Sequence, residues 1–258
     1  MKRGPSALVL AALLLVAGCA QPARARSVSR FVRPGASPST PAASPTTPPP
    51  VRTGDGPAGS VRTTGTDAVA LTFDDGPDPV NTPALLDLLK EQGVKATFCV
   101  VGFRARDHPE LIRRIVDEGH TICNHSWQHL EKLSDRDDGY LLWDLRSTNE
   151  AILNAAPNAK IEYFRAPYGN FTPRLNDYAA LFHLTPIYWA VDDECYRTAE
   201  FGTGPAMAAH MTGLVQAQTR PGSIILSHDN GKPQTVATYR TLLPWLKQHY
   251  RLIPLPVT

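Results

Sequence analysis

The 258-residue sequence lacks a strong excess of charge of either sign. Its 26 lysine and arginine residues nearly balance its 24 aspartate and glutamate residues, which leaves a formal net charge of +2. Because binding to a phosphate backbone needs a clustered positive field, this balance argues against a nucleic-acid partner. The sequence also gives no sign of a protein partner.

Cysteine is scarce, with four residues in the chain. Apart from Cys19, which belongs to the N-terminal segment described below, three remain: Cys99, Cys123 and Cys195. Three is an odd number, so at most one intramolecular disulfide can form and one thiol is left over. Cys99 and Cys123 fall in consecutive predicted strands, but the sequence does not show whether they pair. A fold held together by a disulfide framework is therefore not indicated.

The sequence has no internal repeat, and its N-terminal apolar run, Ala7 to Ala17, is too short to span a bilayer comfortably. With the charged leader Met1–Arg3, this run predicts a secretory signal peptide over residues 1–18. Val16–Cys19 resembles a bacterial lipobox, in which cleavage leaves Cys19 as the lipidated N-terminus. An ordinary signal peptide with an incidental cysteine is the alternative. Both interpretations predict export, and the first adds a lipid anchor in the membrane.

Residues 19–66 differ in composition from the rest of the chain. Proline recurs among serine, threonine, alanine and glycine, and three prolines in a row occupy positions 48–50. Such a tract cannot bury enough apolar surface to offset its chain entropy, so we expect a disordered tether. The tether would hold the domain that follows it, residues 67–258, at the outer face of the cytoplasmic membrane or in the cell wall. If the protein is secreted instead, tether and domain would both enter the medium.

Predicted strands and helices alternate through the domain. The strands are expected near residues 69–73, 95–101, 120–123, 161–164, 185–191, 223–227 and 251–253. The helices are expected near residues 82–92, 107–118, 138–156, 173–182, 205–218 and 234–248. This alternation is typical of an α/β fold with a parallel sheet of βα units. About seven strands are visible, fewer than a closed eight-stranded barrel requires.

Two adjacent carboxylates end the first predicted strand. The apolar run Val69–Phe73 is followed directly by Asp74 and Asp75, and then by the turn formers Gly76 and Pro77. A strand end that leads into a turn can direct both carboxylates into one cleft, where one binds a cation and the other handles a proton. The alternative is a side-chain-capped turn that closes the strand.

Two histidines follow the third predicted strand. His125 and His129 are four residues apart, so they share one face if the segment turns helically. Joined to a strand-end carboxylate, they provide two nitrogens and one oxygen for a metal ion, with a position left for water, as catalytic zinc sites require. Taken alone, the pair could equally be structural.

Four motifs together resemble the polysaccharide deacetylase family, also described as the NodB homology domain or carbohydrate esterase family 4. They are Thr72–Pro77, His125–His129, Arg165–Tyr168 and Leu226–His228, in the family's order and at comparable spacing. The resemblance covers about the last three quarters of the chain. It implies a distorted, incomplete (β/α) barrel, and the count of about seven parallel strands agrees with it.

The resemblance also implies residue roles. Asp74 would be the general base, Asp75, His125 and His129 the ligands of one divalent metal ion, and His228 the general acid. The expected metal is zinc, with cobalt or nickel as alternatives. Arg165 would orient the base.

Other residues are expected to bind the substrate. The backbone N–H of Tyr168 would hold the oxyanion, and Leu226 would line a pocket for the acetyl methyl group. Trp127, Tyr168 and Trp189 are candidates to stack on sugar rings, with core packing as the alternative for each. Asp192 is the fifth residue expected to bind the substrate.

A further motif, the fourth in the family's order, lies between Arg165–Tyr168 and Leu226–His228 and departs from its usual pattern. Members often show Trp-x-x-Asp-x-x-Asp-Trp, whereas Trp189 and Asp192 are here followed by Cys195 and Tyr196. A neutral thiol cannot act as the missing anion. Either Asp192 or Asp193 replaces it, or the tuning of the catalytic groups is weakened.

The resulting hypothesis is a metal-dependent hydrolase that removes N-acetyl groups from an N-acetylhexosamine polymer of the cell envelope. Peptidoglycan is the first candidate substrate and chitooligosaccharide the second, and an O-acetyl xylan esterase would use the same site. A two-histidine, one-carboxylate iron oxygenase has the same ligand set but leaves Asp74 and His228 without a function. A catalytically weak carbohydrate-binding protein is the non-enzymatic alternative.

Overall fold

The computed structural model describes residues 53–258, and its sheet is organised around β1 (Val69–Asp74), a strand whose six residues are all buried. Strand β1 lies between β2 (Thr97–Val100) and β7 (Ile224–His228), parallel to both. A strand buried on both faces needs apolar residues throughout, which explains its continuous hydrophobic run.

The sheet continues in parallel on both sides of β1 in the order β5-β4-β3-β2-β1-β7-β6, and β8 pairs with the start of β1. The remaining strands are β3 (Thr121–Asn124), β4 (Ile161–Phe164), β5 (Thr185–Pro186), β6 (Val191–Asp192) and β8 (Leu252–Ile253). The single strand expected near 185–191 is thus two short strands at opposite ends of the sheet. The prediction of a distorted, incomplete (β/α) barrel is confirmed, with eight strands in the described part of the chain.

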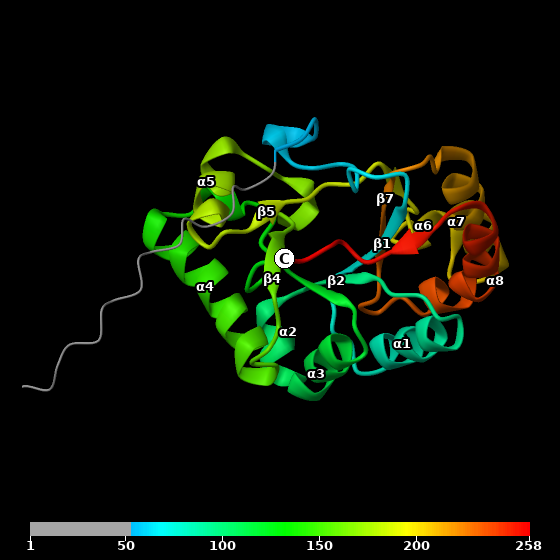
Figure 1. The fold of residues 1–258 in the computed structure, drawn as a ribbon, viewed down its shortest axis with the longest axis horizontal. Helices are drawn as coiled ribbons and strands as arrows, with labels where there is room; N and C mark the ends of the chain where they lie inside the picture. Colours follow the sequence, from blue (N-terminus) through cyan, green and yellow to red (C-terminus); the bar gives the residue numbers. More distant parts are fainter. Residues whose placement is uncertain (1–52) are drawn as a thin grey trace, which may run out of the picture. The chain divides into compact units, whose positions relative to one another are not determined.

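Helices surround the sheet on its outer side (Figure 1). They are α1 (Asn81–Glu91), α2 (Gly102–Asp107), α3 (Pro109–Asp117), α4 (Asp138–Ala155), α5 (Pro173–Leu181), α6 (Thr198–Phe201), α7 (Pro205–Gln218) and α8 (Pro233–His249). Short 3₁₀ turns occupy Pro57–Gly59, Leu133–Asp135 and Pro167–Gly169. Among residues 53–258, no helix combines the length and the apolar character needed to cross a bilayer.

The two faces of the strands bury different sets of residues. On β1, Val69, Leu71 and Phe73 belong to the large outer core shared with the helices, whereas Ala70 belongs to a small inner core. Because side chains alternate along a strand, Thr72 and Asp74 continue the inner face. Inward-facing residues at the carboxyl end of each strand therefore lie in the interior of the half-barrel.

A disulfide joins Cys99 and Cys123 within this inner core, across the paired strands β2 and β3. Cys195 is the remaining thiol of the described residues, and it is buried. The sequence had limited the chain to one such bridge, and the inward register of both cysteines identifies the pair.

Residues 53–66, which we expected to be the end of the tether, are packed against the domain instead. Val61 is buried; its N–H donates to the carbonyl of Pro186, the last residue of β5, and its carbonyl accepts the Tyr188 N–H. The Thr64 N–H donates to the carbonyl of Gly222, just before β7. The segment thus bridges the open side of the half-barrel, because that side leaves strand-edge backbone groups to satisfy. The signal peptide, Cys19 and the rest of the tether lie outside the described residues.

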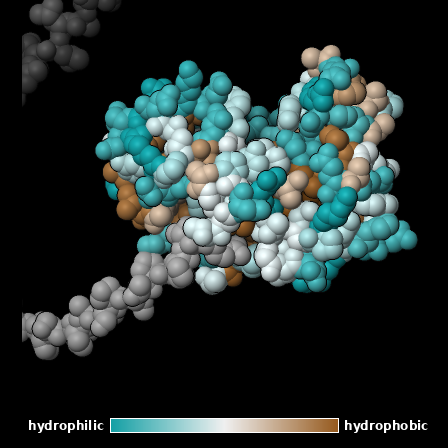
Figure 2. Space-filling model, turned by 90° about the horizontal axis from the view of Figure 1, so that it is seen from above, coloured by the Kyte–Doolittle hydropathy of each residue, from teal (hydrophilic) through white to brown (hydrophobic). Residues whose placement is uncertain are grey.

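Figure 2 shows one face of the molecule, on which hydrophilic residues predominate and hydrophobic ones occur in small groups. An extended apolar surface of the kind that marks a large interface is not visible on this face.

Candidate active site

The predicted site residues come together because they share the inner register of their strands. Asp74 ends β1 and His228 ends β7, and the two are direct partners in the parallel pairing. His125 follows Cys123 by two residues after β3, and Arg165 follows the inward Tyr163 by two residues after β4. All four side chains therefore lie at the carboxyl end of the half-barrel, where parallel barrels carry their chemistry.

Asp75, His125 and His129 form a cluster that can hold a metal ion. One ligand atom from each residue lies within 4.8 Å of the other two. The Asp75 Oδ1 atom is 3.3 Å from His125 Nε2 and 3.1 Å from His129 Nε2. The His125 Nδ1–H donates to the Arg165 carbonyl at 2.8 Å, and since a carbonyl only accepts, the neutral form of the ring has Nε2 unprotonated and available to a cation.

The charges of the cluster favour a cation at its centre. Burial raises the pKa of the Asp75 carboxyl, but hydrogen bonds with His125 and His129 outweigh it and hold that pKa far below its usual range. Burial lowers the pKa of His125, yet Asp74 and Asp75 raise it overall. The carboxylates thus favour positive charge at this position, which a divalent cation on the same three atoms would supply. The two nitrogens and one oxygen fit such an ion.

Asp74 is held by a buried guanidinium. The Arg165 side chain is fully buried, and its Nη1 donates to Asp74 Oδ1 at 2.7 Å and to Thr72 Oγ1 at 2.8 Å. Its Nη2 donates to the Tyr188 carbonyl at 3.0 Å. A buried ion pair whose other donors are satisfied fixes the carboxylate in direction. Asp74 Oδ2, 3.6 Å from His125 Nε2, is directed toward the cluster.

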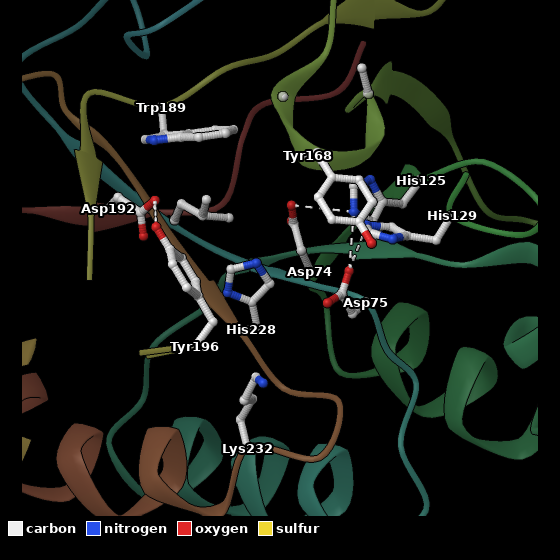
Figure 3. Close-up of a pocket in the computed structure, with 13 residues that line it drawn as sticks. Asp74, Asp75, His125, His129, Tyr168, Trp189, Asp192, Tyr196, His228 and Lys232 are labelled. Atoms are coloured by element: carbon white, nitrogen blue, oxygen red, sulfur yellow. Dashed lines mark hydrogen bonds and ion pairs between the residues drawn. The ribbon is translucent and has the colours of Figure 1, made fainter. Parts of the chain in front are cut away.

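A cavity of about 480 Å³ joins these groups (Figure 3). Figure 3 shows the Asp75–His125–His129 cluster on one side, Asp192, Trp189 and Tyr196 on the other, and Asp74 with His228 between them. Leu226 and Tyr168 also line the cavity, which therefore receives four of the five expected substrate-binding residues: Tyr168, Leu226, Trp189 and Asp192.

Trp127 is the expected substrate-binding residue that does not line this cavity. Its backbone N–H donates to Asp144, and its ring packs against Trp143 at 5.8 Å between centroids and against the large outer core. The chain turns at Ser126 with a positive φ of 63°, which directs Trp127 toward α2 and α4. Trp127 therefore fits the core-packing alternative in the described residues, and its stacking on a sugar stays a prediction.

Three residues that line the cavity have a strained backbone. Asp75, His129 and Tyr168 have φ values of 75°, 54° and 57°. Residues other than glycine rarely adopt this left-handed region, and its cost is accepted mainly where a side chain or backbone group must be aimed. The strained residues are two metal-ligand candidates and the expected oxyanion-binding residue.

The departure in the fourth motif has a structural counterpart. Cys195 is buried with its Sγ 3.2 Å from His228 Nδ1, so the thiol itself occupies the position next to the expected general acid. Asp192 accepts hydrogen bonds from the Glu194 N–H and the Tyr196 hydroxyl, and burial raises its pKa. Asp193 is fully buried behind Cys195, whose N–H donates to Asp193 Oδ1 at 3.0 Å.

The sequence did not identify every residue of the site. Lys232, just before α8, lines the cavity, and Tyr196 stands edge-on to the His228 ring. Asp229 is fully buried beside Gly76, and burial, with the charge of Asp75, raises its pKa to about 7. Lys232 and Asp229 lie within four residues of His228, and that proximity was the available signal.

Known proteins resemble this chain in both sequence and structure. A family profile described as polysaccharide deacetylase matches residues 61–187. A chitooligosaccharide deacetylase of Sinorhizobium fredii is 39% identical over 197 residues, which are 71% of this chain and 87% of the relative. A peptidoglycan-N-acetylglucosamine deacetylase of Bacillus cereus is 34% identical over 192 residues, covering 73% of this chain and 66% of the relative. The crystal structure of a peptidoglycan N-acetylglucosamine deacetylase superposes with a TM-score of 0.67 at 31% identity, covering 78% of this chain and 89% of that one.

Proposed function

Because this chain belongs to the polysaccharide deacetylase family, we propose that it hydrolyses the N-acetyl groups of an N-acetylhexosamine polymer, with one divalent metal ion on Asp75, His125 and His129. The observation that carries the proposal is the convergence of this cluster with Asp74 and His228 in one cavity. Such a cavity provides a cation site, a proton acceptor and a proton donor around one bound acetamide.

Zinc is the metal we propose, since two imidazoles and one carboxylate are a common catalytic zinc set, with cobalt or nickel as substitutes. Bound there, the cation would supply Lewis-acid chemistry, lowering the pKa of water and polarising a carbonyl oxygen. The chain's own residues fix the ligand atoms in advance, through the Arg165 carbonyl behind His125 and the strained turn at His129.

Proton transfer is the work of Asp74 and His228. Asp74 takes a proton from the attacking water, and Arg165 holds the carboxylate in place at the cavity. His228 donates a proton to the amide nitrogen as the C–N bond breaks, so that acetate and a free amine leave. The Tyr168 N–H stabilises the oxyanion, a contribution of about 3 kcal/mol in comparable sites. Leu226 accommodates the acetyl methyl group.

Peptidoglycan is the substrate we propose first. A peptidoglycan deacetylase is similar to this chain in both sequence and structure. Lys232 adds an ammonium group to a cavity that also holds the carboxylates of Asp74, Asp75 and Asp192, and it can pair with the acidic substituents of peptidoglycan. Chitooligosaccharide, which lacks such substituents, is the second candidate, and the Sinorhizobium relative supports it.

Export and anchoring remain part of the proposal. The signal peptide over residues 1–18 and the lipobox at Val16–Cys19 are their support. The proline-rich segment after Cys19 would then connect the anchor to the domain. We expect Cys19→Ala to move the protein from the membrane fraction to the soluble fraction of the envelope, and unchanged fractionation would contradict the anchor.

Acetate release from peptidoglycan and from chitooligosaccharide tests the function. We expect zinc-dependent release that chelation abolishes, and a loss of about 10²- to 10⁴-fold in Asp74→Asn. Metal content should stay at one equivalent in Asp74→Asn and be lost in His125→Ala. Asp177→Asn, a matched change at an exposed position on α5, is the control.

Three outcomes would contradict the proposal. Acetate release that is insensitive to chelator or to Asp74→Asn would exclude the assigned chemistry. Binding of the glycan without any acetate release would favour the carbohydrate-binding alternative. Oxygen consumption with iron in place of acetate release would favour the oxygenase.

A further inference from the structure

The expected general acid contacts a thiol where the family pattern has a carboxylate. The His228 Nδ1 atom lies 3.2 Å from Cys195 Sγ, within hydrogen-bonding distance for sulfur. Cys195 is fully buried, and its carbonyl accepts a hydrogen bond from Gln234 Nε2 at 2.8 Å. The hydrogen bond from Gln234 holds the backbone of Cys195, and the contact with His228 locates its sulfur.

The thiol of Cys195 stays protonated. Burial raises its pKa well above the ordinary range, and the neighbouring Asp193 raises it further. A thiol has one hydrogen to donate and accepts through its sulfur. If the S–H points to a carboxylate, the sulfur lone pairs are left for an imidazole N–H.

Asp193 provides that carboxylate. It is fully buried, and its Oδ1 is already bonded to the Cys195 N–H at 3.0 Å. Its Oδ2 is buried and has no hydrogen-bond partner of good geometry among the described residues. Burial raises the pKa of Asp193 to about 6, while its interactions with Ser227, His228 and Cys195 favour the ionised form. The side chains of Cys195 and Asp193 interact with each other, so this under-satisfied oxygen is available to accept the S–H.

We propose that Cys195 is a positioning residue that connects Asp193 to His228: its S–H donates to Asp193, and its sulfur accepts the Nδ1–H of His228. The ring is then held in the tautomer that carries its proton on Nδ1, and Nε2 is the atom that gives up its proton in the cavity. The carboxylate missing from the fourth motif acts from two residues earlier, through a thiol. The catalytic part of this inference rests on the proposed deacetylase function, whereas the hydrogen bonds do not.

Nitrogen-15 NMR of the histidine rings tests the tautomer without using activity. In the full chain at alkaline pH, where imidazoles are neutral, we expect the wild-type His228 signals to show a protonated Nδ1. Cys195→Ala should shift the ring toward the Nε2-protonated form, and Cys195→Ser should keep the wild-type tautomer because a hydroxyl can both donate and accept. Thr238→Ala is the control, because it removes a buried polar group of α8 that donates to the sulfur of Met211 and not to His228.

The S–H stretching band in the infrared spectrum tests the hydrogen bond from the Cys195 thiol to Asp193. In a Cys19→Ser background, with Cys99 and Cys123 joined, Cys195 carries the thiol that is observed. We expect Asp193→Asn to shift this band to the frequency of a weaker hydrogen bond. An unshifted band would show that the thiol does not donate to Asp193.

Kinetics complete the test. We expect Cys195→Ala to lower kcat about 10- to 100-fold with little change in KM, and Cys195→Ser to recover most of the loss. The double variant Cys195→Asp with Asp193→Asn moves the carboxylate to the family's usual position, and it should retain the Nδ1-protonated ring. An unchanged tautomer and kcat in Cys195→Ala would overturn the proposal. If the wild type releases no acetate but the NMR result holds, the deacetylase assignment fails and the hydrogen-bonded connection stands.

Discussion

At the residue scale, His120 is a buried histidine directly before β3, and it does not line the active-site cavity. Its Nδ1 accepts the Ala96 N–H at 3.0 Å, whereas its Nε2 is buried without a partner among the described residues. Burial, with the nearby charge of Lys95, lowers its pKa to about 4. The folded protein therefore holds this ring neutral.

This pKa predicts how stability depends on pH. Between about pH 6.5 and 4 the unfolded chain binds a proton at His120 and the folded chain does not, so acid favours unfolding. The contribution is complete above pH 6.5 and falls by about 3 kcal/mol as the pH drops to 4. We expect His120→Asn, which keeps an acceptor for the Ala96 N–H, to lose this dependence. Chemical denaturation of both proteins across this pH range measures the difference, and parallel curves would contradict the prediction.

Single residues were the best-predicted level of the site. Asp74 and His228 end strands, and Asp75, His125 and His129 lie in the segments that follow β1 and β3. These strand-end positions, which the sequence pattern contains, bring the five side chains into one cavity. The sequence left core packing and sugar stacking open for Trp127, because the left-handed turn at Ser126 has no signal in a single sequence. The thiol contact of Cys195 could not be foreseen, since it depends on the distance between two separate segments.

At the element scale, α2 packs closely against α4 through Gly102. A methyl group added at Gly102 would lie 2.5 Å from the Trp127 ring and 2.6 Å from the Thr148 hydroxyl. Both separations are below van der Waals contact, and the Thr148 backbone at 3.1 Å cannot move freely. The start of α2 therefore depends on a residue without a side chain.

Two alanine substitutions test this packing. We expect Gly102→Ala to destabilise the protein by about 1–3 kcal/mol, because it overpacks the contact. Gly213→Ala, within α7 where no atom lies within 4 Å of the added methyl group, should be neutral or stabilising by up to about 1 kcal/mol. Urea unfolding of both variants gives the comparison. Equal effects would show that helix propensity, not packing, decides the outcome at Gly102.

Long elements were predicted better than short ones. The helix expected at 138–156 is α4 (Asp138–Ala155), and Asp137 caps it by accepting the Tyr140 N–H. The strand expected at 185–191 is β5 and β6, which lie at opposite ends of the sheet. Two-residue strands carry too little periodicity to be recognised, and their partners, not their own residues, define them.

At the scale of the whole molecule, residues 53–66 bridge the open side of the half-barrel. Val61 contributes to the inner core, and Arg62 Nε donates to the carbonyl of Trp189, a residue of the cavity wall. The segment thus links the proline-rich region to the wall of the active site. Its composition resembles the tether, but its backbone completes the sheet.

Two truncations test whether residues 53–66 stabilise the domain. We expect a chain that begins at residue 53 to keep the melting temperature of the mature protein. A chain that begins at residue 67 should melt about 5–10 °C lower, because it loses the buried Val61 and its backbone bonds. Calorimetry measures the difference. Identical melting temperatures for the two chains would show that the segment contributes nothing to stability.

By itself, the sequence determined the alternation of strands and helices, the polarity of the parallel sheet, and the ligand types at the strand ends. These follow from local periodicity and from side-chain chemistry, which neighbouring residues fix. Only the tertiary structure decided that Cys99 pairs with Cys123, that residues 53–66 join the fold, and that Cys195 stands between Asp193 and His228. Each of these depends on distances between segments far apart in the chain, which packing sets and local pattern does not.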